Sequence, residues 1–186
     1  MKVTQTGLAG VLVLEPDVLG DSRGFFMETF QAARYAELGI PALQQNNLSR
    51  SVRGAVRGLH FQEPHGQGKL VQVVRGAIFD VAVDVRRGSP AFGRWVSAEL
   101  TEDNRRQLWI PPGFAHGFAV LADVADILYQ CTGLYVRAAE HSVRWDDPEI
   151  GIAWPALPGP PMLSAKDAAA PRLRDAQALP PYEPVS

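Results

Sequence analysis

The sequence has one cysteine, no excess of basic residues and no long apolar run, and each of these absences excludes a class of protein. Because Cys131 is the only cysteine in 186 residues, the chain forms neither an intrachain disulfide nor a thiolate metal cluster. The formal net charge is -2, without the basic excess that neutralises a phosphate backbone. A bilayer span needs about 20 apolar residues, and no such run occurs. We therefore expect a cytoplasmic protein whose partners include neither a nucleic-acid polymer nor a membrane.

Long helices are also scarce. The chain contains 17 Gly and 15 Pro, which indicates many turns, while its hydrophobic content of 46% is ordinary for a globular protein. The length fits one domain. The pattern predicts an all-β protein with short helices near 31–38 and 166–170, and the apolar stretch 7–14 as a first strand rather than a signal peptide.

The most informative stretch runs from Arg53 to Gly76. Residues 57–62 alternate in the manner of a half-buried strand, which fixes the face on which His60 stands. Residues 63–68 hold a Pro and two Gly and predict a turn, after which a second strand starts at Lys69. The sequence therefore predicts that His60 and Lys69 lie close together on neighbouring strands.

This pair has two interpretations. A histidine titrates near neutral pH and can act as a base, and a lysine ammonium can stabilise an oxyanion that develops on a carbonyl substrate. Alternatively, His60 is a hydrogen-bonded filler and Lys69 a solvated edge residue. The residues alone leave both interpretations open.

Other segments of the chain give weaker predictions. Residues 17–24 are expected to form a loop, and the polar segment 44–51 either contacts a ligand or satisfies backbone groups in a loop, which is the commoner case. Residues 77–85 predict the strongest strand, with Asp80 and Asp84 on one face and arginines as their expected partners. Tyr129 should point to the same side as its apolar neighbours, where its hydroxyl needs a partner.

Many short strands separated by turns point to a sandwich or a jelly roll. The corner Pro111-Pro112-Gly113-Phe114-Ala115-His116 has the Pro-x-Gly-x-x-His form of the second cupin motif. The His-x-His of the first cupin motif is missing, because Phe61 and Gln62 follow His60. A metal centre with three protein ligands is therefore not expected.

Several long blocks of the sequence together resemble one family, the dTDP-4-dehydrorhamnose 3,5-epimerases, which are metal-free cupins. The blocks are DSRGFFMETF, QNNLSRS, VRGLHFQ, QGKLVQVVRGAIFDVAVDVRRGSPAFGRWV, NRRQLWIPPGFAHGFAVL, ILYQCTGLY, RWDDPEIGIAWP and LSAKD. The resemblance implies a cupin-type jelly-roll barrel with an extended C-terminal segment, no cofactor and a homodimer. It also implies a single epimerase domain, 1–186, with N-terminal strands and a dimer-exchanged region (1–50), a jelly-roll core (51–135) and a wrapping C-terminal segment (136–186).

The resemblance also assigns roles to residues. It implies that His60 is the general base, that Asp167 orients it, that Lys69 stabilises the enolate oxygen and that Tyr129 is the acid on the opposite face of the sugar. Substrate-binding positions are implied for Arg23, Glu28, Gln45, Asn47, Arg57, His116 and Tyr135, of which the first two reach in from the other subunit.

The implied reaction converts dTDP-4-dehydro-6-deoxy-D-glucose to dTDP-4-dehydro-L-rhamnose by inversion at C3 and C5. Two alternatives stay open: a single-centre 3- or 5-epimerase of a related deoxysugar pathway, and a non-catalytic nucleotide-sugar-binding cupin. Strict alternation puts Arg57 and His60 on opposite faces of their strand. If both serve one pocket, we therefore expect either a β-bulge near Gly58 or an Arg57 that reaches a phosphate around the edge of the strand.

Overall fold

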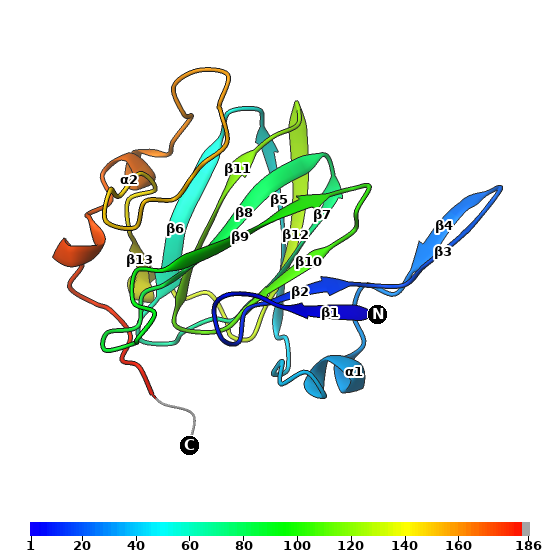
Figure 1. The fold of residues 1–186 in the computed structure, drawn as a ribbon, viewed down its shortest axis with the longest axis horizontal. Helices are drawn as coiled ribbons and strands as arrows, with labels where there is room; N and C mark the ends of the chain where they lie inside the picture. Colours follow the sequence, from blue (N-terminus) through cyan, green and yellow to red (C-terminus); the bar gives the residue numbers. More distant parts are fainter. Residues whose placement is uncertain (184–186) are drawn as a thin grey trace.

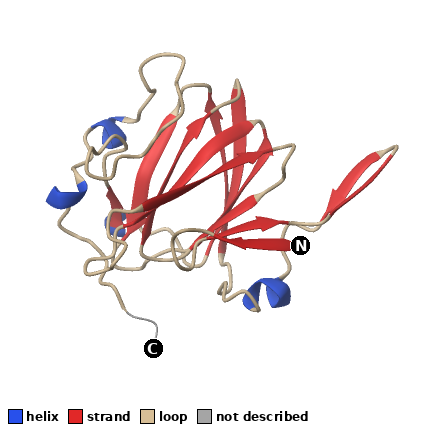
Figure 2. Ribbon diagram, in the orientation of Figure 1, coloured by secondary structure: helices blue, strands red, loops and turns tan. Residues whose placement is uncertain are grey.

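The computed structural model describes residues 1–183 and consists mainly of antiparallel strands in two facing sheets (Figure 1, Figure 2). The predicted all-β architecture is therefore confirmed. In spatial order, one sheet contains β1 (Lys2–Gln5), β2 (Leu12–Glu15), β10 (Gln107–Ile110), β7 (Lys69–Arg75), β12 (Val124–Cys131) and β5 (Gln45–Val52). The other contains β13 (Glu140–Ser142), β6 (Val56–Gln62), β11 (Phe114–Val120), β8 (Ala77–Asp84) and β9 (Trp95–Thr101).

The main core fills the space between the two sheets. Alternate residues of each strand point inward, so both sheets contribute apolar side chains to it. Val71, Leu108 and Ile127 come from the six-stranded sheet, and Ile78 and Phe118 from the five-stranded sheet. Apolar side chains fill one part of the space between the sheets. In the other part, mainly polar side chains line a cavity, which is the candidate site.

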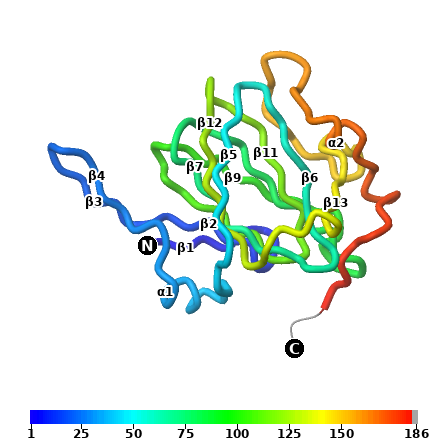
Figure 3. The backbone as a smooth tube through the Cα atoms, turned by 180° about the vertical axis from the view of Figure 1, so that it is seen from behind, coloured from blue at the N-terminus to red at the C-terminus, as the bar shows by residue number. Residues whose placement is uncertain are grey.

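The C-terminal segment covers the outer face of the five-stranded sheet. Val143, Ile150 and Leu173 pack on outward residues of β6 and β8, among them Leu59 and Val81. In Figure 3 this segment runs down the side of the barrel next to β6 and β13. It contains η1 (Arg137–Ala139), α2 (Ala165–Ala168) and η2 (Leu173–Asp175). The last three residues of the predicted wrapping segment, 184–186, lie outside the described residues.

After β2, the N-terminal region leaves the barrel as a hairpin and then returns to cover part of the six-stranded sheet. Tyr35 of α1 (Ala32–Ala36) packs with Leu14 and Trp109 on the outer face of the six-stranded sheet. The hairpin of β3 (Val18–Asp21) and β4 (Gly24–Met27) projects away from the body of the molecule (Figure 1). The prediction of a loop over 17–24 is wrong, because most of this segment belongs to that hairpin.

The polar segment 44–51 is also not a loop. It forms most of β5, which pairs along its whole length with β12. Its side chains alternate between half-buried and exposed, which is typical of a strand with one face toward a polar cavity and the other toward solvent. In the described part of the chain, no helix is both long and apolar enough to cross a bilayer.

The predicted bulge in β6 is present. His60 pairs with His116 and Arg57 with Phe118, so three residues of β6 span the same distance as two of β11. Gly58 lies inside this irregularity with a φ of 125°, and a Cβ there would be 2.5 Å from the Cα of Gly117. Only glycine fits both the backbone angle and the close approach.

Candidate active site

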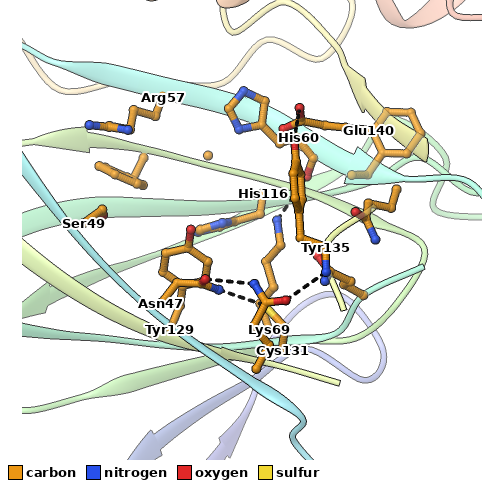
Figure 4. Close-up of a pocket in the computed structure, with 16 residues that line it drawn as sticks. Asn47, Ser49, Arg57, His60, Lys69, His116, Tyr129, Cys131, Tyr135 and Glu140 are labelled. Atoms are coloured by element: carbon orange, nitrogen blue, oxygen red, sulfur yellow. Dashed lines mark hydrogen bonds between the residues drawn. The ribbon is translucent and has the colours of Figure 1, made fainter. Parts of the chain in front are cut away.

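A cavity of about 380 Å³ opens between the two sheets (Figure 4). Its walls come mainly from β5, β7 and β12 on one side and from β6 and β11 on the other. Eight of the eleven predicted site residues line it: Gln45, Asn47, Arg57, His60, Lys69, His116, Tyr129 and Tyr135.

Strand register explains why the residues from the six-stranded sheet meet. Cys131 of β12 lies opposite Gln45 of β5 and opposite Lys69 of β7. Two residues earlier on β12, Tyr129 lies opposite Asn47. Residues that are opposite each other, and residues two apart on one strand, share a face of the sheet. This wall therefore presents amides, a phenol and an ammonium together.

The five-stranded sheet supplies the facing wall. His60 and His116 are direct register partners, and the bulge returns Arg57 to the same face as His60. Ordinary alternation would have turned the Arg57 side chain toward the other face of the sheet. The bulge thus brings a guanidinium and two imidazoles into one cavity.

His60 hydrogen bonds to Asp167, which comes from far downstream in the sequence. The distance from Nε2 to Oδ1 is 2.5 Å, and the Asp167 side chain is buried. Burial lowers the pKa of the His60 imidazole, and the Asp167 carboxylate offsets part of that shift. Burial acts to raise the pKa of Asp167, but the hydrogen bonds from His60 and Ser164 and the nearby positive charges together outweigh burial, and the net shift is downward. The pair therefore combines a neutral imidazole with an ionised carboxylate at neutral pH.

Lys69 points into the cavity rather than outward as a solvated edge residue. Its Nζ donates to the backbone oxygen of His60 at 3.5 Å (Figure 4). Burial lowers the pKa of Lys69, which makes its ammonium a stronger acid than an ordinary lysine. Such a group suits an oxygen that gains negative charge during a reaction.

Tyr129 stands on the wall opposite His60 (Figure 4). Burial raises its pKa, so the phenol keeps its proton at neutral pH and can donate it. Its inward direction agrees with the prediction, since it packs against the core between the sheets.

The partner of His116 is a residue whose role the sequence did not reveal. Asp80 of β8 accepts a hydrogen bond at 2.7 Å between His116 Nε2 and its Oδ1, and both side chains are buried. The predicted arginine partner of Asp80 is therefore wrong, whereas Asp84 does pair with Arg86 at 2.6 Å. The alternation of β8 could have predicted this contact, because it puts the Asp80 carboxylate on the face of the strand that points toward the cavity.

Glu140 is a second residue that sequence reasoning missed. Its carboxylate lines the cavity, accepts a hydrogen bond from Tyr135 Oη at 2.9 Å and forms an ion pair with Lys166 Nζ at 2.6 Å. Burial acts to raise its pKa, but these two donors lower it overall, so the group is ionised. No pattern of the sequence pointed to it, because β13 is only three residues long.

Arg23 and Glu28 do not reach this cavity within their own chain. Arg23 lies at the tip of the projecting hairpin and pairs with Asp21, while Glu28 follows the hairpin and pairs with Arg34. Within residues 1–183, no group of three or more His, Cys, Asp or Glu side chains could hold a metal ion.

The comparisons with known proteins agree with this geometry. The profile of the dTDP-4-dehydrorhamnose 3,5-epimerase family matches residues 5–175. The chain belongs to this family. The dTDP-4-dehydrorhamnose 3,5-epimerase of Pseudomonas aeruginosa is 47% identical over 97% of this chain and 100% of that protein. The enzyme of the same name from Neisseria gonorrhoeae is 51% identical over 91% of this chain, which spans 52% of that longer relative.

A solved structure extends the likeness to three dimensions. The dTDP-6-deoxy-D-glucose-3,5-epimerase of Legionella pneumophila Philadelphia 1, in complex with dTDP-4-keto-L-rhamnose, superimposes with a TM-score of 0.96 at 49% identity. The match covers 98% of this chain and 99% of that one. The predicted family, its cupin fold and its class, an epimerase among the isomerases, are therefore confirmed.

Proposed function

We propose that this family member inverts C3 and C5 of dTDP-4-dehydro-6-deoxy-D-glucose to give dTDP-4-dehydro-L-rhamnose. The observation that carries the proposal is the placement of His60 and Tyr129 on opposite sheets around one cavity. Lys69 enters the same cavity from the sheet that carries Tyr129. Inversion requires that a proton leave one face of a carbon and that another arrive on the opposite face. A base on one wall and a proton donor on the other meet that requirement.

The C4 ketone makes the hydrogens on both C3 and C5 acidic, so one site can treat both carbons. His60 takes the proton, the C–H electron pair forms a carbon–carbon double bond, and the carbonyl electrons move to the oxygen. Lys69 stabilises the resulting enolate oxygen. When the carbonyl re-forms, the carbon takes a proton from the Tyr129 hydroxyl on the other face. Exchange with solvent then deprotonates His60 and reprotonates Tyr129, and no electrons are gained or lost.

The pKa directions support these roles. A base must be neutral, and burial lowers the pKa of His60. An acid must carry its proton, and burial raises the pKa of Tyr129. Asp167 holds the imidazole through its 2.5 Å hydrogen bond and compensates the charge that forms on it.

The remaining residues around the cavity are proposed to bind the substrate. Arg57 offers a guanidinium for the diphosphate, which is the group that planar donors of this kind recognise well. Gln45 and Asn47 offer amide donors and acceptors from β5, His116 lies beside His60, and Tyr135 stands at the rim next to Glu140.

We also propose a homodimer in which Arg23 and Glu28 enter the cavity of the partner subunit. The projecting hairpin supports this, because Leu19 and Phe26 are cross-strand partners on it and are 68% and 69% exposed. An apolar pair on a projecting arm is typical of a contact with another chain. We place the protein in the cytoplasm, where a reducing medium preserves the free thiol of Cys131 beside Lys69.

Incubation with dTDP-4-dehydro-6-deoxy-D-glucose in deuterated water tests the reaction. Deuterium at both C3 and C5 of the product, read by NMR, is the expected result. Label at one carbon alone would assign the chain to the single-centre epimerases, and no label would make it a binding module. Asp103→Asn, in an exposed turn away from the cavity, should incorporate label at the wild-type rate.

A further inference from the structure

Glu140 has no part in the reaction proposed above, yet it joins three elements of the site. It begins β13, which pairs with β6 so that Glu140 lies opposite Gln62 and Ser142 lies opposite His60. Its side chain is 23% exposed, and both carboxylate oxygens are engaged, Oε1 by Lys166 and Oε2 by Tyr135. Figure 4 shows Glu140 and Tyr135 side by side at the cavity. One carboxylate thus connects the rim of the cavity to the C-terminal segment.

Lys166 precedes Asp167 in α2, so the connection leads to the partner of the base. α2 is only four residues long, and a single turn of helix does not hold its own orientation in water. Within residues 1–183, two polar side-chain contacts join α2 to the barrel: Asp167 with His60 at 2.5 Å and Lys166 with Glu140 at 2.6 Å. The second contact therefore limits how α2 can turn about the first.

We propose that Glu140 is a positioning residue that acts through Lys166 to fix the angle at which Asp167 meets the His60 imidazole. The inference rests on the proposed function, since it concerns the residue assigned as base. The Asp167 carboxylate can hold the imidazole usefully only within a narrow range of directions. An ion pair on the adjacent residue of the same helical turn supplies that restriction.

The charges at the site agree with this role. Lys166 lies near enough to His60 to disfavour the protonated imidazole, the species that forms when His60 takes a proton. Glu140 pairs with that ammonium directly and so reduces its effect. Removal of the Glu140 charge would leave Lys166 both free to move and uncompensated beside the base.

The competing explanation is an ordinary ion pair that merely fastens the C-terminal segment. Exposed pairs of that kind contribute little. Glu149 and Arg174 form such a pair at 2.8 Å in the same segment, with side chains 49% and 56% exposed. Glu149→Gln is therefore a matched control for Glu140→Gln, since each variant removes one carboxylate charge from an ion pair.

The kinetic test measures kcat and KM for Glu140→Gln, Lys166→Met and the double variant. We expect kcat to fall roughly 10- to 100-fold in each single variant, because slight misplacement of a catalytic group has effects of that size. KM should change by no more than about twofold, since the lost contact does not bind substrate. The double variant should be no slower than the slower single variant, because both changes break one contact. Glu149→Gln should match the wild type.

A second measurement needs no substrate. The proton in the short His60–Asp167 hydrogen bond should give a downfield 1H NMR resonance, assigned by its loss in Asp167→Asn. We expect it to shift or broaden in Glu140→Gln and Lys166→Met, and to stay in place in Glu149→Gln. If the variants show these NMR responses but the wild-type protein does not turn over the keto sugar, the proposed function is overturned and the positioning role is supported.

Three results would overturn the positioning role. The first is wild-type kcat in Glu140→Gln. The second is a fall in kcat for Glu140→Gln that Lys166→Met does not share, which would mean that the carboxylate acts directly on the substrate. The third is a lower melting temperature in Glu140→Gln with kcat and the NMR resonance unchanged, which would make the pair purely structural.

Discussion

His60 and His116 are register partners on adjacent antiparallel strands, and each imidazole bonds a different aspartate. The His60 partner, Asp167, arrives from the C-terminal segment, whereas the His116 partner, Asp80, lies on the next strand of the same sheet. His60 is the more accessible ring, with 27% of its side chain exposed against 9% for His116. The accessible ring is the one positioned to take a proton from a ligand in the cavity.

The first prediction separates the base from the acid. His60→Ala should abolish deuterium exchange at both C3 and C5, because His60 is the assigned base, whereas His116 is held by Asp80 and the Glu140 carboxylate by Tyr135 and Lys166. Tyr129→Phe keeps the ring and removes only the hydroxyl, so it should impair inversion more than the exchange of solvent hydrogen into the substrate. NMR of substrate and product in deuterated water measures both. If Tyr129→Phe inverts normally, Tyr129 is not the acid.

The second prediction concerns pH. His60 must be neutral to act, and burial lowers its pKa below the ordinary 6.5. The midpoint of the acid limb of the kcat/KM profile should therefore lie below pH 6.5. Asp167→Asn removes a group that raises the His60 pKa, so its acid limb should lie lower still, with a reduced plateau. An acid limb above pH 6.5 in the wild type would contradict the assignment.

The lowered pKa of His60 also determines how the free energy of unfolding depends on pH. A histidine whose pKa is lower in the folded state binds its proton more readily in the unfolded state. The contribution of His60 is thus fully present above pH 6.5 and is lost as pH falls through the folded-state pKa. His60→Asn should make the free energy of unfolding less dependent on pH in that range, which urea titrations at several pH values can measure.

The third prediction concerns the bulge. Ala at Gly58 would adopt a φ of 125° and place its Cβ 2.5 Å from the Cα of Gly117. We expect Gly58→Ala to reduce the free energy of unfolding by more than about 3 kcal/mol, because backbone strain and a backbone clash combine. The folded fraction should also lose kcat/KM, since the bulge sets Arg57 and His60 on one face.

Gly88→Ala is the control for strain alone. Gly88 has a φ of 87°, and a Cβ there would meet nothing within 4 Å. Its substitution should reduce the free energy of unfolding by about 1 to 2 kcal/mol and leave kcat/KM unchanged. Equal losses of stability in the two variants, measured by urea unfolding, would show that the close approach to Gly117 has no importance.

Local pattern predicted part of this site well. Alternation placed His60 and Tyr129 on defined faces, and the short turn before Lys69 put that residue beside His60, because neighbouring strands constrain each other over short distances. The bulge was one of two arrangements that could unite Arg57 with His60, and the structure has it. The partnership of Asp167 came only from the family resemblance, since 107 residues separate it from His60.

Long-range partners explain what the sequence did not reveal. Asp80 had arginines nearby in sequence, but its side chain points inward, where the register of β8 with β11 brings His116 within reach. Glu140 depends on how a three-residue edge strand and α2 fold back over β6. The strand β5 was mistaken for a loop because polar residues lie on both of its faces, one toward the cavity and one toward solvent.

The last prediction concerns the projecting hairpin. Leu19 and Phe26 lie opposite each other and are largely exposed, so burial of this pair against a second copy would be favourable. Leu19→Ser combined with Phe26→Ser should shift the protein from dimer to monomer in sedimentation velocity. KM should rise as well, because Arg23 on the same hairpin would no longer reach the partner's cavity. Phe92→Ser, at a phenylalanine that is 40% exposed elsewhere on the surface, should leave both measurements unchanged. A wild-type protein that sediments as a monomer with full activity would exclude the shared site, because each cavity would then work without an arm from a second chain.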